Sequence, residues 1–283
     1  MVVSPAVSSD EYDETYFLTN CGGYQDFVAS GGKQLPWRLA RPLELAELKA
    51  GQRVLDFGCG RGELAAHAAN MGATVVGLDY SHSALQIAVR TATWLASPNR
   101  ARLSFVQAAA GVDYFAPKSF DCIFMTDVVE HLSPAELETT LRLARNWLKP
   151  HGKLIIHTFP NRLFYNLGYK WTWLTLRLFD SLRKLYKPGA APFTQSHTWN
   201  YPRHQYELKM HINEQDFYKL RRILRRANFN FRLWLEDEPP AARLHYTWKL
   251  RLYVALVRLE PLSKYPPLNR WFASHLWAVA KTA

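Results

Sequence analysis

Three glycines at alternate positions, Gly58, Gly60 and Gly62, constrain the fold more than any other feature of the sequence. They follow residues 53–57, which are typical of a buried strand, and precede a helical pattern that ends at Gly72. Glycines at such a junction allow the backbone to turn tightly and to approach a ligand closely. The turn therefore predicts a nucleotide-like ligand at the carboxyl edge of a parallel sheet.

Strand patterns alternate with helical patterns after this turn, as is typical of an α/β fold with a parallel sheet. Ser133 is followed by Pro134 and Glu136, which predicts a helix that starts with a capping box. Asn213, with Asp216 three residues later, is expected to cap a later helix. We predict a doubly wound, Rossmann-like sheet of seven strands. The expected strands are residues 53–57, 74–78, 102–107, 120–125, 153–158, 229–235 and 275–281, and the expected helices are 63–71, 83–95, 134–148 and 214–227.

Two insertions dense in aromatic and basic residues, 162–210 and 239–272, interrupt this alternation. We expect both to be largely helical, including residues 244–259, and to lie together as a cap over the acceptor site, that is, the part of the ligand site where a substrate would bind. Residues 51–161 and 211–283 are then the core, and residues 1–50 an N-terminal helical segment that covers the bound ligand. Part of the first insertion has apolar residues at helical spacing with Lys and Arg at the edges, typical of a packed core helix or of an interfacial one. These apolar residues are Trp171, Leu174, Leu178, Leu182 and Leu185.

The formal net charge of +11 is unevenly distributed along the chain. Residues 1–161 contain 14 Lys and Arg against 16 Asp and Glu, whereas residues 162–283 contain 21 against 8. This asymmetry predicts either a solvated basic surface or an anionic partner, such as a membrane surface, a phosphate-bearing substrate or a nucleic acid. The three cysteines have no paired spacing, which favours a reducing compartment. Because neither a secretory signal nor a spanning apolar run is visible, we expect a cytoplasmic location, with peripheral membrane contact left open.

Two aspartates narrow the identity of the ligand. Asp56 stands two positions before Gly58, and Asp79 ends the second strand, where a carboxylate can accept both hydroxyls of a ribose. The stretch VLDFGCGRGELAAHAANMGATVVGLDYS resembles motifs I and II of the class I S-adenosylmethionine (SAM)-dependent methyltransferases. FDCIFMTDVVEHL and LKPHGKLIIHTFPN resemble the fourth and fifth strands of that family.

The resemblance implies a role for each matched residue. Asp56 and the three glycines would line the methionine end of SAM, Asp79 would hold the ribose, and Tyr80 would flank the adenine. Thr126 or Asp127, after the fourth strand, would face the reacting centre. Many relatives have an acidic residue after the third strand, whereas here Gln107 is followed by alanines, so Gln107 or backbone groups would contact the adenine. Near the N-terminus, Tyr12, Tyr16, Phe17 and Tyr24 resemble the segment that folds over SAM in these enzymes.

Asp127, Glu130 and His131 lie in the loop after the fourth strand, and His211 precedes a later helix. Carboxylates and imidazoles suit Mg²⁺ or another divalent cation, and a histidine without a metal can act as a general base. A purely structural role for this loop is the third interpretation. The pattern D-x-x-E-H with a later His resembles E-x-x-E-H…H in the ubiquinone-pathway O-methyltransferases and in the small-RNA 2′-O-methyltransferases, with Asp127 in place of Glu.

We therefore expect a SAM-dependent methyltransferase that methylates a hydroxyl of a small-molecule, glycan or lipid-linked acceptor. RNA ribose methylation and N- or C-methylation of a small molecule are the alternatives within the family. RNA is the less favoured acceptor, because no RNA-binding module is visible. A non-catalytic SAM-binding or membrane-adaptor protein is the alternative from another class.

Overall fold

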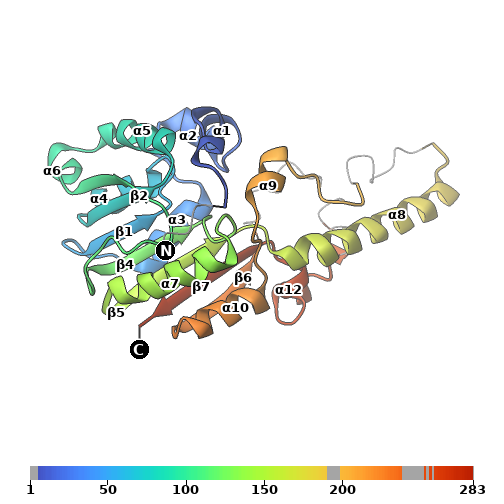
Figure 1. Cartoon of the computed structure of the whole chain (residues 1–283). Coiled ribbons are helices and arrows are strands. Elements are labelled where there is room, and N and C mark those ends of the chain that lie inside the picture. Colours follow the sequence, from blue (N-terminus) through green and yellow to red (C-terminus); the bar gives the residue numbers. More distant parts are fainter. Residues whose placement is uncertain (1–5, 190–197, 238–251, 253–254, 257, 283) are drawn as a thin grey trace.

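The computed structural model of the chain describes residues 6–189, 198–237, 252, 255–256 and 258–282. Seven strands of the described chain form one sheet in the order β3-β2-β1-β4-β5-β7-β6 (Figure 1). The pairs from β3 to β5 are parallel, whereas β7 runs antiparallel to β5 and β6. The predicted doubly wound, Rossmann-like sheet is thus confirmed. The strands are β1 (Arg53–Phe57), β2 (Thr74–Asp79), β3 (Leu103–Gln107), β4 (Phe120–Thr126), β5 (Leu148–Thr158), β6 (Asn230–Glu236) and β7 (His275–Lys281).

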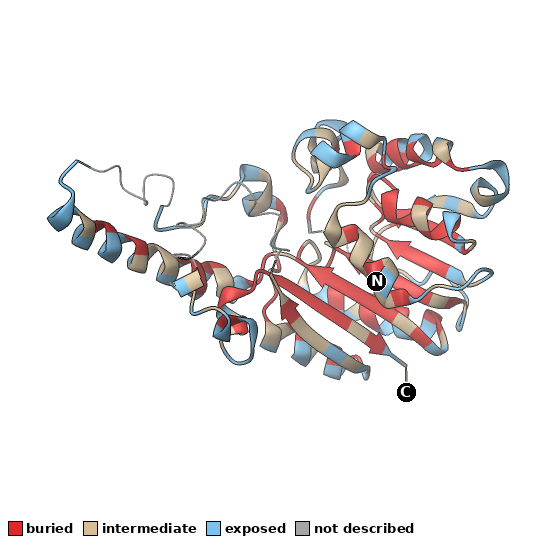
Figure 2. Cartoon of the chain, turned by 180° about the vertical axis from the view of Figure 1, so that it is seen from behind, coloured by how far each residue is buried: buried red, intermediate tan, exposed pale blue. Residues whose placement is uncertain are grey.

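Helices cover both faces of this sheet, and Figure 2 shows its central strands as the most buried part of the molecule. α3 and α4 pack against one face, and α7 and α10 pack against the other. Short N-terminal helices lie over α5 at one end of the sheet (Figure 1). The helices of the described chain are α1 (Glu14–Thr19), α2 (Tyr24–Ser30), α3 (Trp37–Ala46), α4 (Glu63–Asn70), α5 (His82–Thr91), α6 (Ser97–Arg100), α7 (Pro134–Trp147), α8 (Tyr169–Tyr186), α9 (Gln205–Met210), α10 (Phe217–Arg226) and α12 (Asn269–Phe272), with short 3₁₀ or π turns η1 (Ser9–Glu11), η2 (Ala92–Trp94), η3 (Phe164–Gly168) and η6 (Leu262–Lys264).

Neighbouring residues of β1 show how the strand sequence builds two cores. Val54 packs with Leu64 of α4 on one face, while Leu55 packs with Leu141 of α7 on the other. Successive side chains of a strand point to opposite faces, so a strand covered on both sides needs a continuous apolar run. Truncating a side chain as buried as that of Leu141 to alanine costs about 2–5 kcal/mol. The strand ends that carry the site are therefore held by packing on both faces.

The predicted capping box is present at α7. The Ser133 hydroxyl accepts the N–H of Glu136, and the Glu136 carboxylate accepts the N–H of Ser133. The predicted cap of α10 is wrong, because Asp216 caps that helix instead of Asn213. Asp216 Oδ1 accepts the backbone N–H groups of Tyr218 and Lys219 at 2.9 Å. Asn213 is buried beside the loop after β4, where its N–H donates to the Glu130 carbonyl.

The first insertion divides into two parts that lie in different places. α8 leads away from the sheet, whereas α9 returns to its carboxyl edge (Figure 1). Most of the expected helix 244–259 lies outside the described residues. No helix in the described part of the chain combines the length and the apolar character needed to span a bilayer.

Candidate functional site

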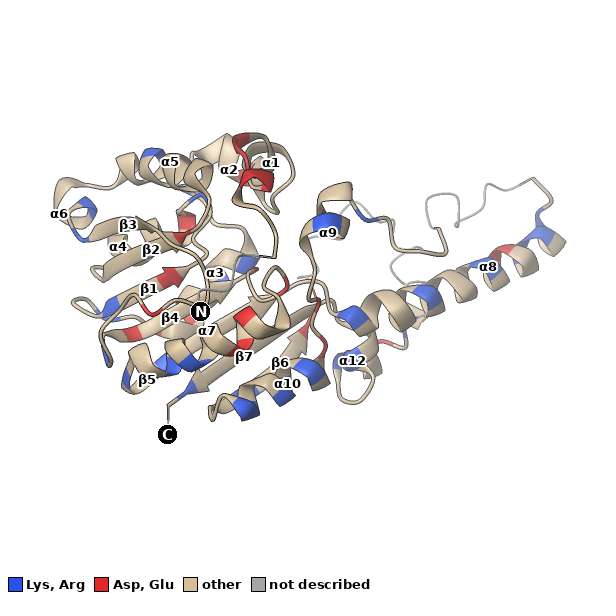
Figure 3. Cartoon of the chain, in the orientation of Figure 1, with Lys and Arg blue, Asp and Glu red and all other residues tan. Residues whose placement is uncertain are grey.

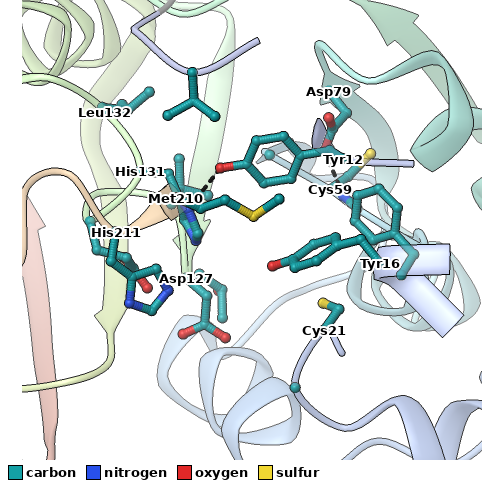
Figure 4. A pocket seen from close by; sticks show the side chains of 18 of the residues that line it. Tyr12, Tyr16, Cys21, Cys59, Asp79, Asp127, His131, Leu132, Met210 and His211 are labelled. Atoms are coloured by element: carbon teal, nitrogen blue, oxygen red, sulfur yellow. Dashed lines mark hydrogen bonds between the residues drawn. The ribbon is translucent and has the colours of Figure 1, made fainter. Parts of the chain in front are cut away.

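A cavity of about 410 Å³ lies where the strand order reverses between β1 and β4. Crossover connections leave these two strands in opposite directions, which opens a crevice at their carboxyl ends. The cavity wall comes from the ends of β1, β2 and β4, the N-terminal segment and the residues around α9 (Figure 4). Its volume is typical of pockets that bind small molecules. The expected site residues in the wall are Gly58, Gly60, Asp79, Tyr80, Thr126, Asp127, Glu130, His131 and His211.

The glycine turn needs residues without side chains. Gly58, Gly60 and Gly62 have φ angles of 73°, 50° and 75°, in the left-handed region. A Cβ atom on Gly58 would lie 2.4 Å from Val128, and one on Gly62 would lie 2.7 Å from Ala88 Cβ. Gly62 ends the turn as the residue before α4 and does not itself line the cavity. The turn brings the backbone of Gly58 and Gly60 to the wall while α4 and α5 pack behind it.

Asp79 ends β2 at the cavity. One of its carboxylate oxygens accepts the N–H of Gly60 and the other that of Ser81, both at 2.9 Å. A carboxylate has about four lone-pair sites, so Asp79 keeps acceptor capacity for a hydroxyl group of a ligand. Burial raises the pKa of Asp79 above its ordinary value, while the hydrogen bonds from the backbone lower it. Asp79 is therefore a preorganised acceptor at the place expected for a ribose.

Asp56 is buried and is not among the residues that line the cavity, so its expected place beside the ligand stays a prediction. Its Oδ2 atom accepts no hydrogen bond from any described residue. Burial, with a further contribution from the nearby Asp79, raises the pKa of Asp56 to about 7. Gln107 is also not among the residues of the wall, and its amide donates to the Tyr80 carbonyl at 3.2 Å. Ala108 and Ala110 line the wall next to it, and the contact of Gln107 with an adenine stays a prediction.

Tyr12 and His131 form a hydrogen-bonded pair inside the cavity (Figure 4). The Tyr12 hydroxyl lies 2.8 Å from His131 Nδ1, and the Tyr12 carbonyl accepts the Ser81 hydroxyl at 2.6 Å. Burial lowers the pKa of His131 to about 4, against a raising effect of its hydrogen bond to the Met210 backbone. Burial also raises the pKa of Tyr12 far above its usual value. Near neutral pH the pair is thus a neutral imidazole next to an intact phenol.

Two arginines hold the N-terminal segment over the cavity. Arg61 is buried and donates to the carbonyls of Phe17 and Gly22, each at 2.9 Å, while its Nε donates to Glu63 at 2.7 Å. Arg38 donates to the Gly22 carbonyl and to the Asp127 carboxylate. Tyr12, Tyr16 and Phe17 line the cavity as a result, whereas Tyr24 does not.

Glu130, His131 and His211 bring one ligand atom each to within 4.8 Å of one another. Burial raises the pKa of Glu130 to about 7, although Thr158 donates a hydrogen bond to it at 2.8 Å. Burial and the neighbouring His131 lower the pKa of His211 to about 3. Its Nδ1 atom has no hydrogen-bond partner among the described residues. One carboxyl group and two neutral imidazoles are therefore gathered at one end of the cavity.

Asp127, which we expected to join this group as a ligand, has other partners. Its carboxylate is paired with Arg38, and Oδ1 lies 2.6 Å from His157 Nδ1 without hydrogen-bond geometry between them. His157 Nε2 in turn lies 2.9 Å from His275 Nδ1. Burial lowers the pKa of both histidines well below the usual value. Thr126, beside Asp127, lines the cavity with a buried hydroxyl that has no partner among the described residues.

Comparison with known proteins gives relatives over part of the chain. A protein described as an uncharacterised methyltransferase of Synechocystis sp. is 33% identical over 127 residues, which cover 44% of this chain and 56% of that protein. The ubiquinone biosynthesis O-methyltransferase of Chelativorans sp. is 31% identical over 140 residues, covering 46% and 47%. The chain thus spans about half the length of these curated relatives.

One solved structure shares the fold over nearly the whole chain. It is phosphoethanolamine N-methyltransferase 2 of Haemonchus contortus, in complex with phosphomonomethylethanolamine and S-adenosylhomocysteine. The TM-score is 0.54 at 20% identity, with 95% of this chain and 60% of that one covered. A family model described as a methyltransferase domain matches residues 32–233, which include the glycine turn, Asp79, the Glu130–His131 loop and His211. The chain therefore belongs to the methyltransferase domain family of class I SAM-dependent methyltransferases.

Proposed function

We propose that the chain binds SAM in the cavity and catalyses transfer of its methyl group to a hydroxyl of a small acceptor. The residues present fit SAM in charge and in hydrogen bonding. Asp79 keeps acceptor capacity for the ribose hydroxyls, and the Gly58–Gly60 backbone leaves room for close approach. Six Asp and Glu residues but only two Arg residues line the cavity, which suits the cationic sulfonium and ammonium groups of SAM.

The observation that carries the assignment is the Tyr12–His131 pair at the carboxyl end of β4, in the same cavity as Asp79. When bound, SAM supplies an electrophilic methyl group whose bond to sulfur breaks as the new bond to the acceptor oxygen forms. The acceptor hydroxyl must lose its proton. Tyr12 accepts this proton as its own passes to His131 Nδ1, and the neutral imidazole is available because its pKa is about 4. General-base catalysis contributes about 10²–10⁴-fold, and because a base with a pKa well below the working pH is weak, we expect the contribution of His131 at the lower end of this range.

The cover over the cavity contributes orientation and the exclusion of water. Tyr12, Tyr16 and Phe17 close one side, and Arg61 holds them through main-chain carbonyls. Leu132, Phe159 and Met210 add apolar surface on the acceptor side. A cavity of about 410 Å³ with such walls favours a small aromatic or otherwise apolar acceptor over a polynucleotide.

A divalent cation held by Glu130, His131 and His211 is the second candidate for activating the acceptor. The closeness of the three groups and the unpartnered His211 Nδ1 among the described atoms favour it. One carboxylate and two imidazoles suit Zn²⁺, Mn²⁺ or Fe²⁺ better than Mg²⁺. Such an ion would lower the pKa of an acceptor hydroxyl. Metal analysis, together with thermal unfolding of the chelated chain before and after adding Zn²⁺ or Mn²⁺, tests it. Absence of a bound metal and of any shift in the unfolding temperature would contradict the cation.

The methyl-transfer proposal is tested with methyl-labelled SAM and three acceptor pools: catechol-like phenols, phosphoethanolamine and RNA. Label in a phenol would support hydroxyl methylation. Label only in phosphoethanolamine would contradict hydroxyl methylation and indicate N-methylation instead. Label only in RNA would contradict a small-molecule acceptor. With the responding acceptor, Tyr12→Phe and His131→Asn should each lower kcat by about 10²-fold or more. Tyr24→Phe and His82→Asn, which change residues outside the cavity wall, are the matched controls.

A further inference from the structure

Helix α8 is the least embedded long helix of the described chain. It extends from η3 away from the sheet, and most of its residues are exposed (Figures 1 and 2). Only three of its side chains are buried, Tyr169, Leu176 and Asp180, and their spacing places them on one side of the helix. None of the residues of α8 lines the cavity. Of the described residues of this insertion, only those around α9 reach the cavity wall, and the expected cap over the acceptor site stays a prediction.

The side of α8 opposite its buried residues is apolar. On a wheel of about 100° per residue, five side chains fall within an arc of about 80°, centred opposite the buried side. Their exposed fractions run from 47% at Trp171 to 74% at Leu185, with Leu178 at 62%. A surface helix normally turns its apolar side to the core and its polar side to water. In α8 this order is reversed. The five residues are Trp171, Leu174, Leu178, Leu182 and Leu185.

Basic residues flank this apolar face. On the same wheel, Lys170, Arg177 and Lys184 lie along one edge of the face, whereas Arg183 lies toward the buried side. Lys187 follows the helix. Figure 3 shows Lys and Arg residues along the length of α8. Asp180 is the single acidic residue of α8, and it is on the buried side. The exposed part of the helix therefore has an apolar centre with basic residues along one edge.

We propose that α8 is a membrane-binding helix that lies in the headgroup region of an anionic lipid bilayer. Its Trp and Leu side chains would enter the acyl boundary, while the long Lys and Arg side chains reach back to the lipid phosphates. Charge favours this occupant over a second copy of the chain. A symmetric pairing through α8 would bring two sets of basic residues together, and the single acidic residue of this helix, Asp180, is on the buried side, whereas anionic lipid attracts each nearby Lys or Arg. The proposal does not depend on methyl transfer.

Flotation of the purified full chain with vesicles tests the proposal. Vesicles of phosphatidylcholine mixed with phosphatidylglycerol should bind the chain, and vesicles of phosphatidylcholine alone should bind it at least tenfold more weakly. Leu178→Gln with Leu185→Gln should lower the partition coefficient by about a hundredfold, since each buried leucine contributes roughly tenfold or more. The matched control is Met71→Gln with Val89→Gln, which replaces two exposed apolar residues on another part of the surface.

Charge is tested in the same way. Lys184→Glu with Lys187→Glu should weaken binding to the anionic vesicles more than Arg221→Glu with Arg225→Glu on α10, which makes the same change in net charge. All four double variants should keep the circular dichroism spectrum and the unfolding temperature of the unsubstituted chain, which shows that they fold. Lack of vesicle binding, or equal losses in the α8 variants and their controls, would overturn the proposal. If the chain dimerises with concentration, the two leucine changes abolish dimerisation and no vesicles are bound, the face binds a second copy of the chain and the membrane proposal is overturned.

Discussion

Replacing Asp56 with asparagine should stabilise the ligand-free chain at neutral and alkaline pH. Asp56 is 3% exposed, and its Oδ2 atom has no hydrogen-bond partner in the described chain. Burial raises its pKa from 3.8 to about 7, so the native state holds a proton that the unfolded chain releases. Asparagine has nearly the same shape and no charge to desolvate.

The magnitude follows from the shift in pKa. A rise of about three pH units at about 1.4 kcal/mol per unit corresponds to on the order of 4 kcal/mol. Because the folded pKa is above the unfolded one, the contribution of Asp56 to stability is fully present below about pH 4 and is lost as the pH rises to about 7. The difference in unfolding free energy between Asp56→Asn and the unsubstituted chain should thus be small at pH 4. It should grow to on the order of 4 kcal/mol in favour of the variant above pH 7.

Urea unfolding of both proteins without ligand, followed by circular dichroism across this pH range, measures the difference. Glu138→Gln, which removes a negative charge from an exposed position of α7, should change stability by less than about 0.5 kcal/mol throughout. A difference between Asp56→Asn and the unsubstituted chain that does not vary with pH would refute the reasoning, because it would mean that Asp56 is not a desolvated, titrating carboxyl group.

Three further predictions concern the turn, its cover and the reacting pair. Gly62→Ala places a Cβ 2.7 Å from Ala88 at a φ of 75° and should lower the unfolding free energy by about 2–4 kcal/mol; a loss below about 1 kcal/mol in urea unfolding would argue against it. Arg61→Met removes the hydrogen bonds to the carbonyls of Phe17 and Gly22 and should destabilise the closed position of the N-terminal segment by about 3 kcal/mol or more. Proteolysis of this segment should then be at least tenfold faster, whereas Arg90→Met, at an exposed ion pair, should leave its rate unchanged. The kcat of the responding acceptor should fall as the pH drops toward about 4, where His131 takes up a proton, and an acid limb centred near pH 6 would contradict its low pKa.

Local signals in the sequence predicted most of the fold correctly. The glycine turn, the capping box at Ser133 and the strand patterns depend on the conformational preferences of residues that are close together in the sequence. The cap of α10 was mistaken because Asn213 and Asp216 are both good capping residues. Burial of Asn213 against the loop after β4, a tertiary effect, decides between them.

The site was predicted less completely than the fold because its key contacts join distant parts of the chain. Tyr12 meets His131 across 119 positions, and Arg38 meets Asp127 across 89. Nothing local in the sequence indicates that the Asp127 carboxylate pairs with Arg38 instead of joining Glu130 as a metal ligand. The periodicity of the α8 sequence likewise shows which residues share a face, but the same periodicity is expected whether that face packs on the core or is exposed to solvent. The exposed fractions of these side chains in the folded chain show that the face points away from the core.

Calorimetric titration of the chain with S-adenosylhomocysteine tests most directly whether this cavity is a SAM site. We expect saturable binding at one site, weakened about tenfold or more by Asp79→Asn, which removes the charged acceptor of the ribose hydroxyls. Asp121→Asn, at the start of β4 and outside the cavity wall, should leave the affinity unchanged. Absence of binding, or equal affinity in the two variants, would contradict the assignment of the cavity.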